Sequence, residues 1–260
     1  MAGKRGLIMG VANKNSLAWG IAQALHRHGA ELAFTYQGEA LGKRVRPLAE
    51  QLGSDIIVDC DVENDASVDA VFARLTDAWG GLDFVVHAIA FSDKDELMGH
   101  YVDTTRENFR RTMEISCFSF TAIARRAAPL MSAGGAMLTL SFSGANRVMP
   151  NYNIMGVAKA ALEASVRYLA ADLGAKNIRI NAISAGPMRT LAGAAVGGAR
   201  QILNHCQDNA PLERQLSLED IGGSALYLLS DLSASVSGEI HHVDSGYNIM
   251  GMPDSRGAQN

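Results

Sequence analysis

Seven short runs of β-branched and apolar residues alternate with longer helical stretches along the chain. The runs are GLIMGV, ELAFTY, DIIVDCDV, LDFVVHAIA, AMLTLSF, IRINAIS and GEIHHVD. Each run is almost continuously apolar, which is typical of strands covered by helices on both faces. A regular alternation of strand and helix also predicts parallel pairing. The sequence therefore predicts an α/β fold, a Rossmann-type doubly wound domain with a seven-stranded parallel sheet and helices on both faces.

The size of the chain fits a single domain of this kind. With 260 residues, of which 48% are hydrophobic and 19% charged, it can bury a sizeable core. Because no internal repeat or long linker interrupts it, we expect one dinucleotide-binding domain over residues 1–260. The stretch GAAVGG at 193–198 is rich in glycine and alanine, so we expect a mobile substrate-binding segment, a lid, at about residues 190–210.

Composition argues against several classes of function. A net charge of −4 gives no electrostatic reason to expect nucleic acid or an anionic membrane as the main partner. The three cysteines are few and widely separated, which predicts neither a disulfide framework nor a metal site and favours the cytoplasm. We expect a soluble protein, because the apolar run near Met1 is too short for a signal peptide and no stretch approaches a membrane span.

A glycine-containing loop follows the first predicted strand. Gly10, Ser16, Ala18 and Gly20 are spaced so that the loop turns tightly before a helix begins. The helix N-terminus can then hold a pyrophosphate, with Ser16 adding a hydroxyl donor and Gly20 letting helix and sheet approach closely. The same residues also fit an ordinary capped helix after a strand.

Polar residues at the ends of later strands favour a dinucleotide. Gln37 ends the second strand, where a neutral polar side chain suits a free ribose 2′-hydroxyl, so we expect NAD, with NADH preferred over NADPH. The nearby cations Lys43 and Arg44 leave NADP, which carries a 2′-phosphate, as an alternative cofactor. Asp61 and Val62 follow the third strand, where the carboxylate can meet the adenine amino group or cap a turn. His87 is more readily an interior histidine than a proton donor, and we give it no catalytic role.

Tyr152 and Lys159 lie seven residues apart in a predicted helix at about 152–173. This interval puts both side chains near one helix face, about 10 Å apart along the axis. The phenol can donate a hydrogen bond to a substrate oxygen while the ammonium holds a nicotinamide ribose and lowers the pKa of the phenol. Such a pair also occurs by chance on many helices, so its weight comes from the surrounding motifs.

These motifs together resemble the enoyl-acyl-carrier-protein reductases of bacterial fatty acid synthesis, a divergent branch of the short-chain dehydrogenase/reductases. The resemblance covers nearly the whole chain and is carried by Ser16-Leu17-Ala18-Trp19-Gly20, FTYQ, CDV, PNYN with the lysine seven after its tyrosine, SAGPMRTLA and SGEIHHVDSGY. It implies hydride transfer from NADH to the β-carbon of a trans-2-enoyl thioester. The negative charge that then develops on the thioester carbonyl oxygen is met by Tyr152 and Lys159.

The resemblance also implies roles for individual residues. Tyr152 would hydrogen-bond the thioester carbonyl and Lys159 the ribose, while the segment after Thr190 would fold over the acyl chain. The catalytic residues would be Tyr152 and Lys159. The cofactor would be bound by Gly10, Ser16, Leu17, Gln37, Asp61, Val62, Ile89, Lys159, Met188 and Thr190, and the substrate by Phe142, Tyr152, Ala90 and Ala192.

Two departures from the family pattern bear on the substrate. Phe142 stands ten residues before Tyr152, where many members carry a second tyrosine, so the wall of the pocket keeps a ring but loses a hydroxyl. The stretch GGARQILNH offers only Arg200 for docking an acidic carrier protein, with Lys43 and Arg44 as other candidates. Either an acyl-carrier-protein or a coenzyme A thioester therefore fits the sequence.

Other functions on the same scaffold stay open from the sequence. In a 3-ketoacyl or carbonyl reductase, Ser141 would help Tyr152 to bind the oxygen of a ketone. A non-catalytic NAD-binding sensor would need neither Ser141 nor Tyr152. The resemblance further implies a homotetramer, assembled through the C-terminal strand and the helices at about 105–130 and 152–173. Those helix faces can equally pack on the sheet of their own chain.

Overall fold

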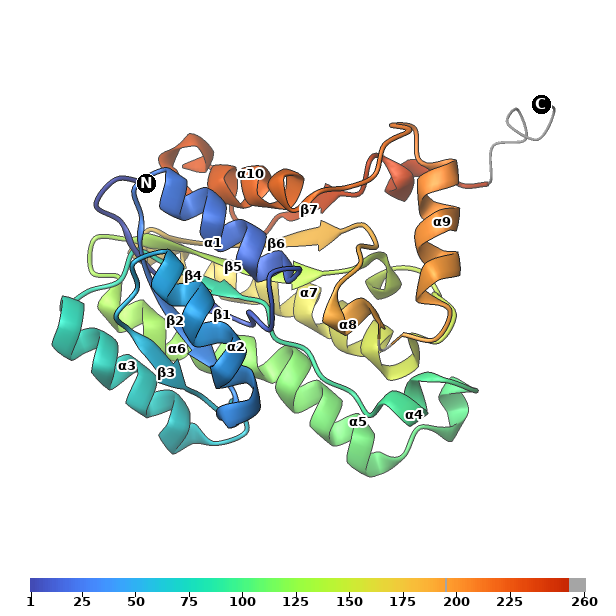
Figure 1. Cartoon of the computed structure of the whole chain (residues 1–260), viewed down its shortest axis with the longest axis horizontal. Coiled ribbons are helices and arrows are strands. Elements are labelled where there is room, and N and C mark those ends of the chain that lie inside the picture. The colour runs from blue at the N-terminus through green and yellow to red at the C-terminus, as the bar shows by residue number, and fades with distance from the viewer. Residues whose placement is uncertain (195, 253–260) are drawn as a thin grey trace.

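The computed structural model describes residues 1–194 and 196–252, and in them one parallel sheet forms the centre of the molecule (Figure 1). Its strand order is β3-β2-β1-β4-β5-β6-β7. The predicted seven-stranded parallel sheet is confirmed. The strands are β1 (Arg5–Met9), β2 (Glu31–Tyr36), β3 (Ile57–Asp59), β4 (Phe84–His87), β5 (Gly135–Ser141), β6 (Ile178–Ala185) and β7 (Ile240–Val243).

The chain reverses the direction in which it builds the sheet between β1 and β4. From β1 it moves outwards to β2 and β3, then returns to place β4 on the other side of β1, with Met9 opposite His87. In doubly wound folds such a reversal of strand order marks a crevice at the carboxyl edge of the sheet. Such a crevice is where doubly wound folds bind their ligands.

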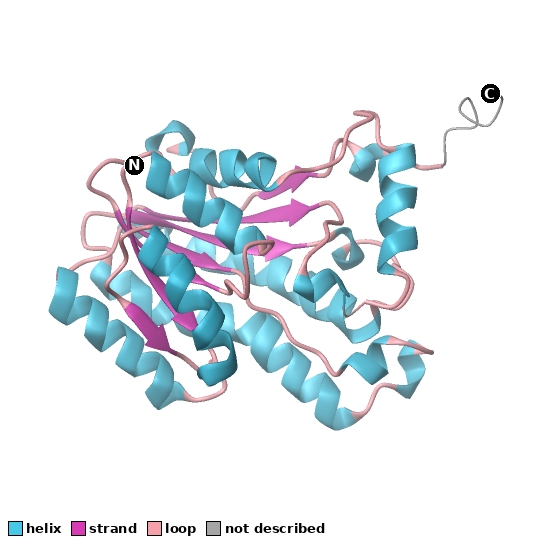
Figure 2. Cartoon of the chain, in the orientation of Figure 1, coloured by secondary structure: helices cyan, strands magenta, loops and turns pink. Residues whose placement is uncertain are grey.

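Helices cover both faces of the sheet, as the apolar strands predict (Figure 2). Two separate apolar cores result, one on each face. The first core uses α1 (Leu17–Arg27), α2 (Gly38–Gln51) and α10 (Leu218–Leu229), and the second uses α3 (Asp65–Trp79), α6 (Ser119–Ala127) and α7 (Asn153–Leu173). Phe34 and Phe84 are fully buried in the first core, and Phe120 in the second.

The helix expected at about 105–130 is interrupted. It consists of α5 (Arg106–Met113), a π-helical turn over Glu114–Phe118, α6, and a final 3₁₀ turn. A π turn inserts an extra residue and shifts the helix face by part of a turn, which the apolar pattern of the sequence does not reveal. The helix expected at about 152–173 is confirmed as α7.

Gly20 has a different role from the one predicted. A Cβ at this position would lie 2.7 Å from the Cβ of Leu218 and 2.8 Å from its carbonyl oxygen, in α10 rather than in the sheet. Gly222 makes the reciprocal approach, since a Cβ there would lie 2.8 Å from the carbonyl oxygen of Gly20. The glycine therefore brings α1 against α10, and these two helices lie side by side at the top of Figure 1.

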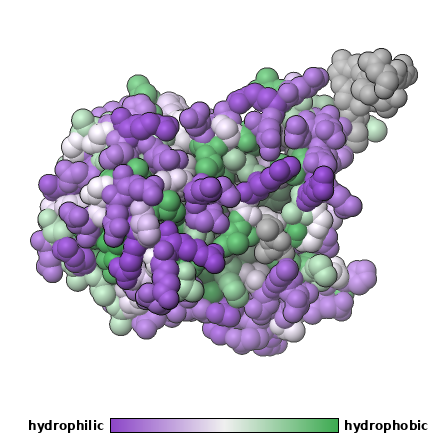
Figure 3. Space-filling view, viewed as in Figure 1, coloured by the Kyte–Doolittle hydropathy of each residue, from purple (hydrophilic) through white to green (hydrophobic). Residues whose placement is uncertain are grey.

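Three further helices lie beyond the carboxyl edge of the sheet. They are α4 (Lys94–Leu97), α8 (Leu191–Ala194) and α9 (Ala199–Asn209), and the arrowheads of β5 to β7 point towards the side where α8 and α9 lie (Figure 1). Apolar side chains gather in the recessed middle of this face, between polar rims (Figure 3). Among the helices of the described ranges, none combines the length and apolar character needed to cross a membrane.

Candidate active site

The loop after β1 is shaped for a ligand at the crevice. Gly10 has φ +98°, and a Cβ there would lie 2.0 Å from the carbonyl oxygen of Ala88, in the loop after β4. Both the backbone angle and the close approach require glycine. The two loops that border the switch point therefore touch each other at Gly10, and its role in binding a phosphate-bearing ligand stays a prediction.

Ser16 holds this loop in place. It immediately precedes α1, and its Oγ accepts hydrogen bonds from the backbone N–H groups of Ala12 and Asn13 at 3.0 and 3.1 Å. Because the oxygen accepts twice, its own O–H remains to donate to an anion. Leu17 begins the helix whose N-terminal amides carry partial positive charge. The structure therefore brings Gly10, Ser16 and Leu17 together around a place suited to a pyrophosphate.

The side chains expected along the adenosine lie at the ends of β2 and β3. Gln37 is exposed directly after β2, and Asp61 is partly buried after β3. Asp61 Oδ1 accepts from the N–H of Glu63 at 3.0 Å, so one carboxylate oxygen performs the turn-capping role that the sequence left open. Asn64 rather than Asp61 caps α3. Val62 and Ile89 contact the core from the same edge of the sheet.

Arg46 packs against Tyr36, the last residue of β2. Its guanidinium hydrogen-bonds the hydroxyl of Tyr36 and lies over that ring, with its Cζ 4.7 Å from the ring centroid. Lys43 and Arg44 are exposed on the same helix, α2. The sequence did not single out Arg46, which is placed by the aromatic residue that ends β2.

A pocket of about 170 Å³ lies beside the start of α1. Asn15 lines it from the loop after β1, Met188 and Arg189 from the loop after β6, and Ser217 and Leu218 from the start of α10. Met188 thus lines the same pocket as Asn15 of the loop after β1, and its place at the nicotinamide stays a prediction. Thr190 Oγ1 accepts from the N–H of Gly193 at 2.9 Å and so begins α8.

Tyr152 immediately precedes α7 and is half-buried. Its ring meets that of Phe142 edge to face, with centroids 5.1 Å apart. Its other side is bordered by Gly144, where a Cβ would lie 2.4 Å from Tyr152 Cδ1. The phenylalanine predicted to form the pocket wall therefore orients the tyrosine, while the need for Gly144 had no signal in the sequence.

The pKa of the Tyr152 phenol is raised rather than lowered, contrary to the prediction from Lys159. Burial raises the pKa of Tyr152, and the carboxylate of Glu163 raises it further. The phenol is therefore fully protonated at neutral pH. A protonated phenol is the form that donates a hydrogen bond to a carbonyl oxygen.

Lys159 lies deeper in the same helix and is only 6% exposed. Its Nζ donates to the carbonyl oxygen of Leu140 at 2.7 Å, which fixes the side chain and leaves two N–H donors for another ligand. Burial lowers the pKa of Lys159 to about 8, partly offset by Cys117 and Glu163. The ammonium therefore retains most of its charge at neutral pH.

Glu163 is a functional residue that the sequence analysis missed. It is buried one turn after Lys159, and its Oε1 accepts a hydrogen bond from the Oγ of Ser141 at 2.5 Å. A carboxylate four residues after a lysine is usually a surface ion pair, so the sequence gave no reason to place it inside. The hydroxyl of Ser141 is directed to this carboxylate.

His87 is an interior histidine, as expected. Its two ring nitrogens lie 3.1 Å from Thr139 Oγ1 and 2.8 Å from Ser119 Oγ, and none of its surface is exposed. Burial, with the charge of Lys159, lowers the pKa of His87 to about 3. It stays neutral at the end of β4.

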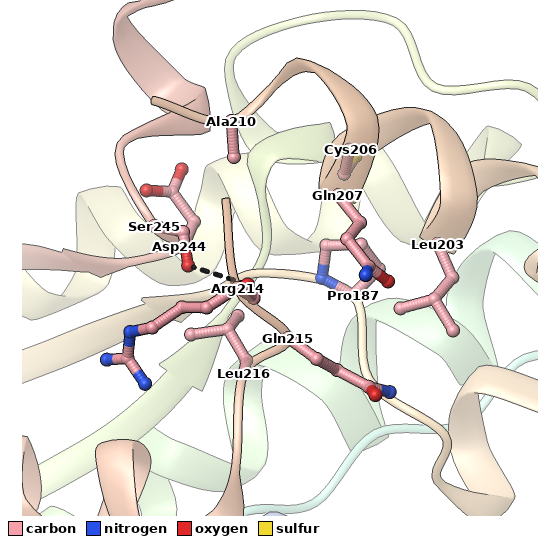
Figure 4. A pocket seen from close by; sticks show the side chains of 10 residues that line it. All are labelled: Pro187, Leu203, Cys206, Gln207, Ala210, Arg214, Gln215, Leu216, Asp244 and Ser245. Carbon is pink, nitrogen blue, oxygen red and sulfur yellow. Dashed lines mark hydrogen bonds between the residues drawn. The ribbon is translucent and has the colours of Figure 1, made fainter. Parts of the chain in front are cut away.

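The expected lid contains two helices within the described residues. α9 packs over a small pocket of about 20 Å³ lined by Pro187, Leu203, Cys206 and Ser245, among others (Figure 4). Arg214 turns its guanidinium away from Leu203 and binds Asp220 instead. This pocket is too small for an acyl thioester. Ala90 is exposed after β4, whereas the side chain of Ala192 lies outside what the structure describes.

The geometry accommodates a dinucleotide. Gly10 lets the loop after β1 pack against the loop after β4, Ser16 retains a donor at the N-terminus of α1, and Lys159 retains two donors beside Tyr152. A doubly wound sheet with this loop at its switch point, a tyrosine directly before the helix that follows β5, and a lysine within that helix define a dinucleotide-dependent oxidoreductase.

The chain belongs to the enoyl-(acyl carrier protein) reductase family, whose model matches residues 10–248. It is 69% identical over 253 residues to the enoyl-[acyl-carrier-protein] reductase [NADH] 2 of Rhizobium meliloti, covering 97% of this chain and 94% of that protein. The Escherichia coli enoyl-[acyl-carrier-protein] reductase [NADH] is 52% identical over 97% of both chains. The crystal structure of the Anaplasma phagocytophilum reductase in complex with NAD matches with a TM-score of 0.95 and 58% identity, covering 98% and 97% of the two chains.

Proposed function

We propose that the protein is an NADH-dependent enoyl-acyl-carrier-protein reductase of fatty acid synthesis, and that Tyr152 and Lys159 are its catalytic residues. The relatives that share 52–69% of its sequence carry this activity in their names. The cofactor supplies a hydride to the β-carbon of the trans-2-enoyl thioester. All other contributions come from side chains and backbone of the crevice.

Tyr152 meets the charge that develops on the substrate. Its protonated phenol donates to the thioester carbonyl oxygen, where negative charge accumulates as the β-carbon is reduced. Lys159 is held by Leu140, directs its remaining donors to the cofactor ribose and adds positive potential beside the phenol. Phe142 and Gly144 fix the ring between them. The α-carbon then receives a proton from solvent or a relay.

Cofactor binding is assigned to the crevice. We propose that Gly10, Ser16 and Leu17 hold the pyrophosphate and that Gln37 faces the adenosine ribose. Asp61, Val62 and Ile89 border the adenine side, while Met188 and Thr190 border the nicotinamide side. We propose that the substrate lies against Phe142, Tyr152, Ala90 and Ala192.

One observation carries the choice of an enoyl over a ketone substrate: the hydroxyl of Ser141 is bonded to Glu163 at 2.5 Å. A ketone reductase needs a second hydroxyl at the substrate carbonyl beside the tyrosine. Here the serine is committed to a buried carboxylate, which leaves Tyr152 as the hydroxyl donor beside Phe142.

NADH oxidation by the purified protein tests this function. We expect consumption of NADH with an enoyl thioester, little with a 3-ketoacyl thioester, and loss of activity by about a hundredfold in Tyr152→Phe. NADH binding should persist in that variant. Turnover of the ketoacyl thioester alone would contradict the proposal, and binding without turnover of either thioester would favour a sensor.

We further propose that the acyl group is delivered by acyl-carrier protein. The names of the relatives support this, although α9 contributes only Arg200 as a strong cation, and Lys43 and Arg44 are exposed on α2. We expect a lower KM for the carrier-protein thioester than for the coenzyme A thioester. The KM for the carrier-protein thioester should rise with salt concentration.

A cytoplasmic homotetramer is the assembly we propose. Phe109, Phe118, Val157 and Tyr168 remain 38–76% exposed on α5, the π turn and α7, where apolar faces lack cover from their own chain. Cys60, Cys117 and Cys206 are all free and buried, which suits a reducing compartment. Light scattering during size-exclusion chromatography tests the assembly, and a mass of 27.6 kDa, that of one chain, would contradict it.

A further inference from the structure

The residues on both sides of Tyr152 have a rare backbone conformation. Asn151 has φ +57° and Asn153 has φ +36°, in the region that non-glycine residues seldom adopt. Asparagine tolerates this region better than most residues, yet two such positions around one tyrosine still cost stability. Conformations of this kind persist where surrounding contacts hold them, and they concentrate at functional sites.

The side-chain amides of the two asparagines make contacts that hold this conformation. Asn151 Nδ2 donates to the carbonyl oxygen of Gly197 at 2.8 Å. Asn153 Nδ2 lies 3.3 Å from the carbonyl oxygen of Glu96 and 3.4 Å from that of Gly99. One asparagine is thus tied to the segment after β6, and the other to the segment after β4.

These two segments meet beside Asn151. A Cβ at Gly197 would lie 3.1 Å from Met98 Sδ and 3.2 Å from Asn151 Nδ2. The segment after β6 therefore packs against both the segment after β4 and the amide of Asn151. Both segments leave the carboxyl edge of the sheet, on the side where Tyr152 lies.

We propose that Asn151 and Asn153 are positioning residues, which set the Tyr152 phenol in place when the segments that carry Gly197 and Gly99 are docked. Enclosure of the substrate and alignment of its hydrogen-bond donor are then a single event. This inference rests on the proposed function, because it assigns Tyr152 the donor role. It adds that the donor is aligned through the amides of its two neighbours.

Three variants distinguish the effect of the side-chain amide from the effect of the backbone conformation. Asn151→Gly permits the same φ but removes the amide, and Asn153→Gly does so on the other side. Asn151→Asp keeps the size and the tolerance of positive φ but presents a carboxylate oxygen to the carbonyl of Gly197. Asn177→Gly is the matched control, because Asn177 also has φ +57° and ends a 3₁₀ turn before β6, away from the cleft.

Hydrogen exchange, NADH affinity and steady-state kinetics are measured for each variant. We expect Asn151→Gly and Asn151→Asp to lower kcat/KM for a crotonyl and a dodecenoyl thioester by about tenfold, with the NADH Kd unchanged. Amide protection should fall at residues 196–202 in both. Asn153→Gly should lose protection at 96–101 with a similar loss of kcat/KM, and Asn177→Gly should match the wild type.

The inference would be overturned if Asn151→Gly kept the wild-type kcat/KM and the wild-type amide protection. Full activity in both Asn151 variants would also overturn it, because the backbone conformation alone would then suffice to position Tyr152. Failure of the proposed function has a different signature, namely a wild-type protein that turns over no enoyl thioester. In that case, exchange at 196–202 still decides whether the amide of Asn151 holds the segment.

Discussion

Ser141 Oγ donates to Glu163 Oε1 at 2.5 Å, inside the protein and one helical turn from Lys159. The hydroxyl is thereby committed to a buried carboxylate, which lies close enough to Lys159 and Tyr152 to raise the pKa of both. The ionisable groups that share this interior are Lys159, Tyr152, Cys117 and His87. Glu163 raises the pKa of both Lys159 and Tyr152, so it should influence how the site titrates.

Glu163→Gln should move the alkaline limb of the pH–rate profile to lower pH. Glu163 raises the pKa of Lys159, which is already lowered to about 8 by burial, and it also raises the pKa of Tyr152. Removing the negative charge favours the neutral amine and the ionised phenol, so both protons leave at lower pH. We expect a shift of about one unit, measured from kcat/KM between pH 6 and 10. Glu50→Gln, on the exposed side of α2, is the control, and an alkaline limb that does not move would contradict the expectation.

His87→Gln should weaken the acid dependence of stability. The pKa of His87 falls from 6.5 to about 3 on folding, so between these values the unfolded chain binds a proton that the folded chain refuses. The wild type therefore loses stability as the pH falls from 6.5 towards 3, by up to about 1.4 kcal/mol per pH unit from this group. Urea unfolding at several pH values should show a shallower slope in the variant. Parallel curves for the two proteins would refute this account.

Two adjacent glycines of α10 should respond oppositely to alanine. A Cβ at Gly222 would lie 2.8 Å from the carbonyl oxygen of Gly20 and 2.8 Å from the Cβ of Ala24, whereas nothing lies within 4 Å of one at Gly223. Gly222→Ala should lower the free energy of unfolding by about 1–3 kcal/mol. Gly223→Ala should raise it by about 0.5–1 kcal/mol, through helix propensity. Chemical denaturation measures both free energies of unfolding. Equal changes in the two variants would show that α1 and α10 can move apart at Gly222 without loss of stability.

Ser16→Ala should weaken NADH binding more than it weakens the fold. The substitution removes the acceptor of two loop amides, Ala12 N–H and Asn13 N–H, together with the hydroxyl donor at the start of α1. We expect the NADH Kd to rise by about tenfold in a fluorescence titration. Asn64→Ala, which removes the cap of α3, is the matched control and should cost about 1 kcal/mol of stability without changing the Kd. An equal Kd in both variants would argue against Ser16 at the pyrophosphate.

The sheet could be predicted from the sequence because each strand is a compact apolar run. All seven runs overlap a strand, although β3, β4 and β7 are each at least three residues shorter than their runs. Tyr152 and Lys159 were predictable because a single helix fixes their spacing.

Contacts between distant segments could not be predicted. Gly20 meets Leu218, Ser141 meets Glu163 and Asn151 meets Gly197, and each pair depends on the packing of separate elements rather than on local pattern. The sign of the pKa shift of Tyr152 failed for the same reason. Sequence spacing shows the nearby lysine but not the burial and the Glu163 carboxylate, which raise the pKa.

The packing of α1 against α10 has a consequence for biosynthesis. Helix α1 leaves the ribosome early. Helix α10, which packs against α1, comes almost at the end of the chain. At about 5–20 residues per second, the apolar face of α1 waits on the order of ten seconds or more for its partner. The nascent chain must therefore be shielded from aggregation over that interval, and a chain that stops before Leu218 cannot complete its cofactor site.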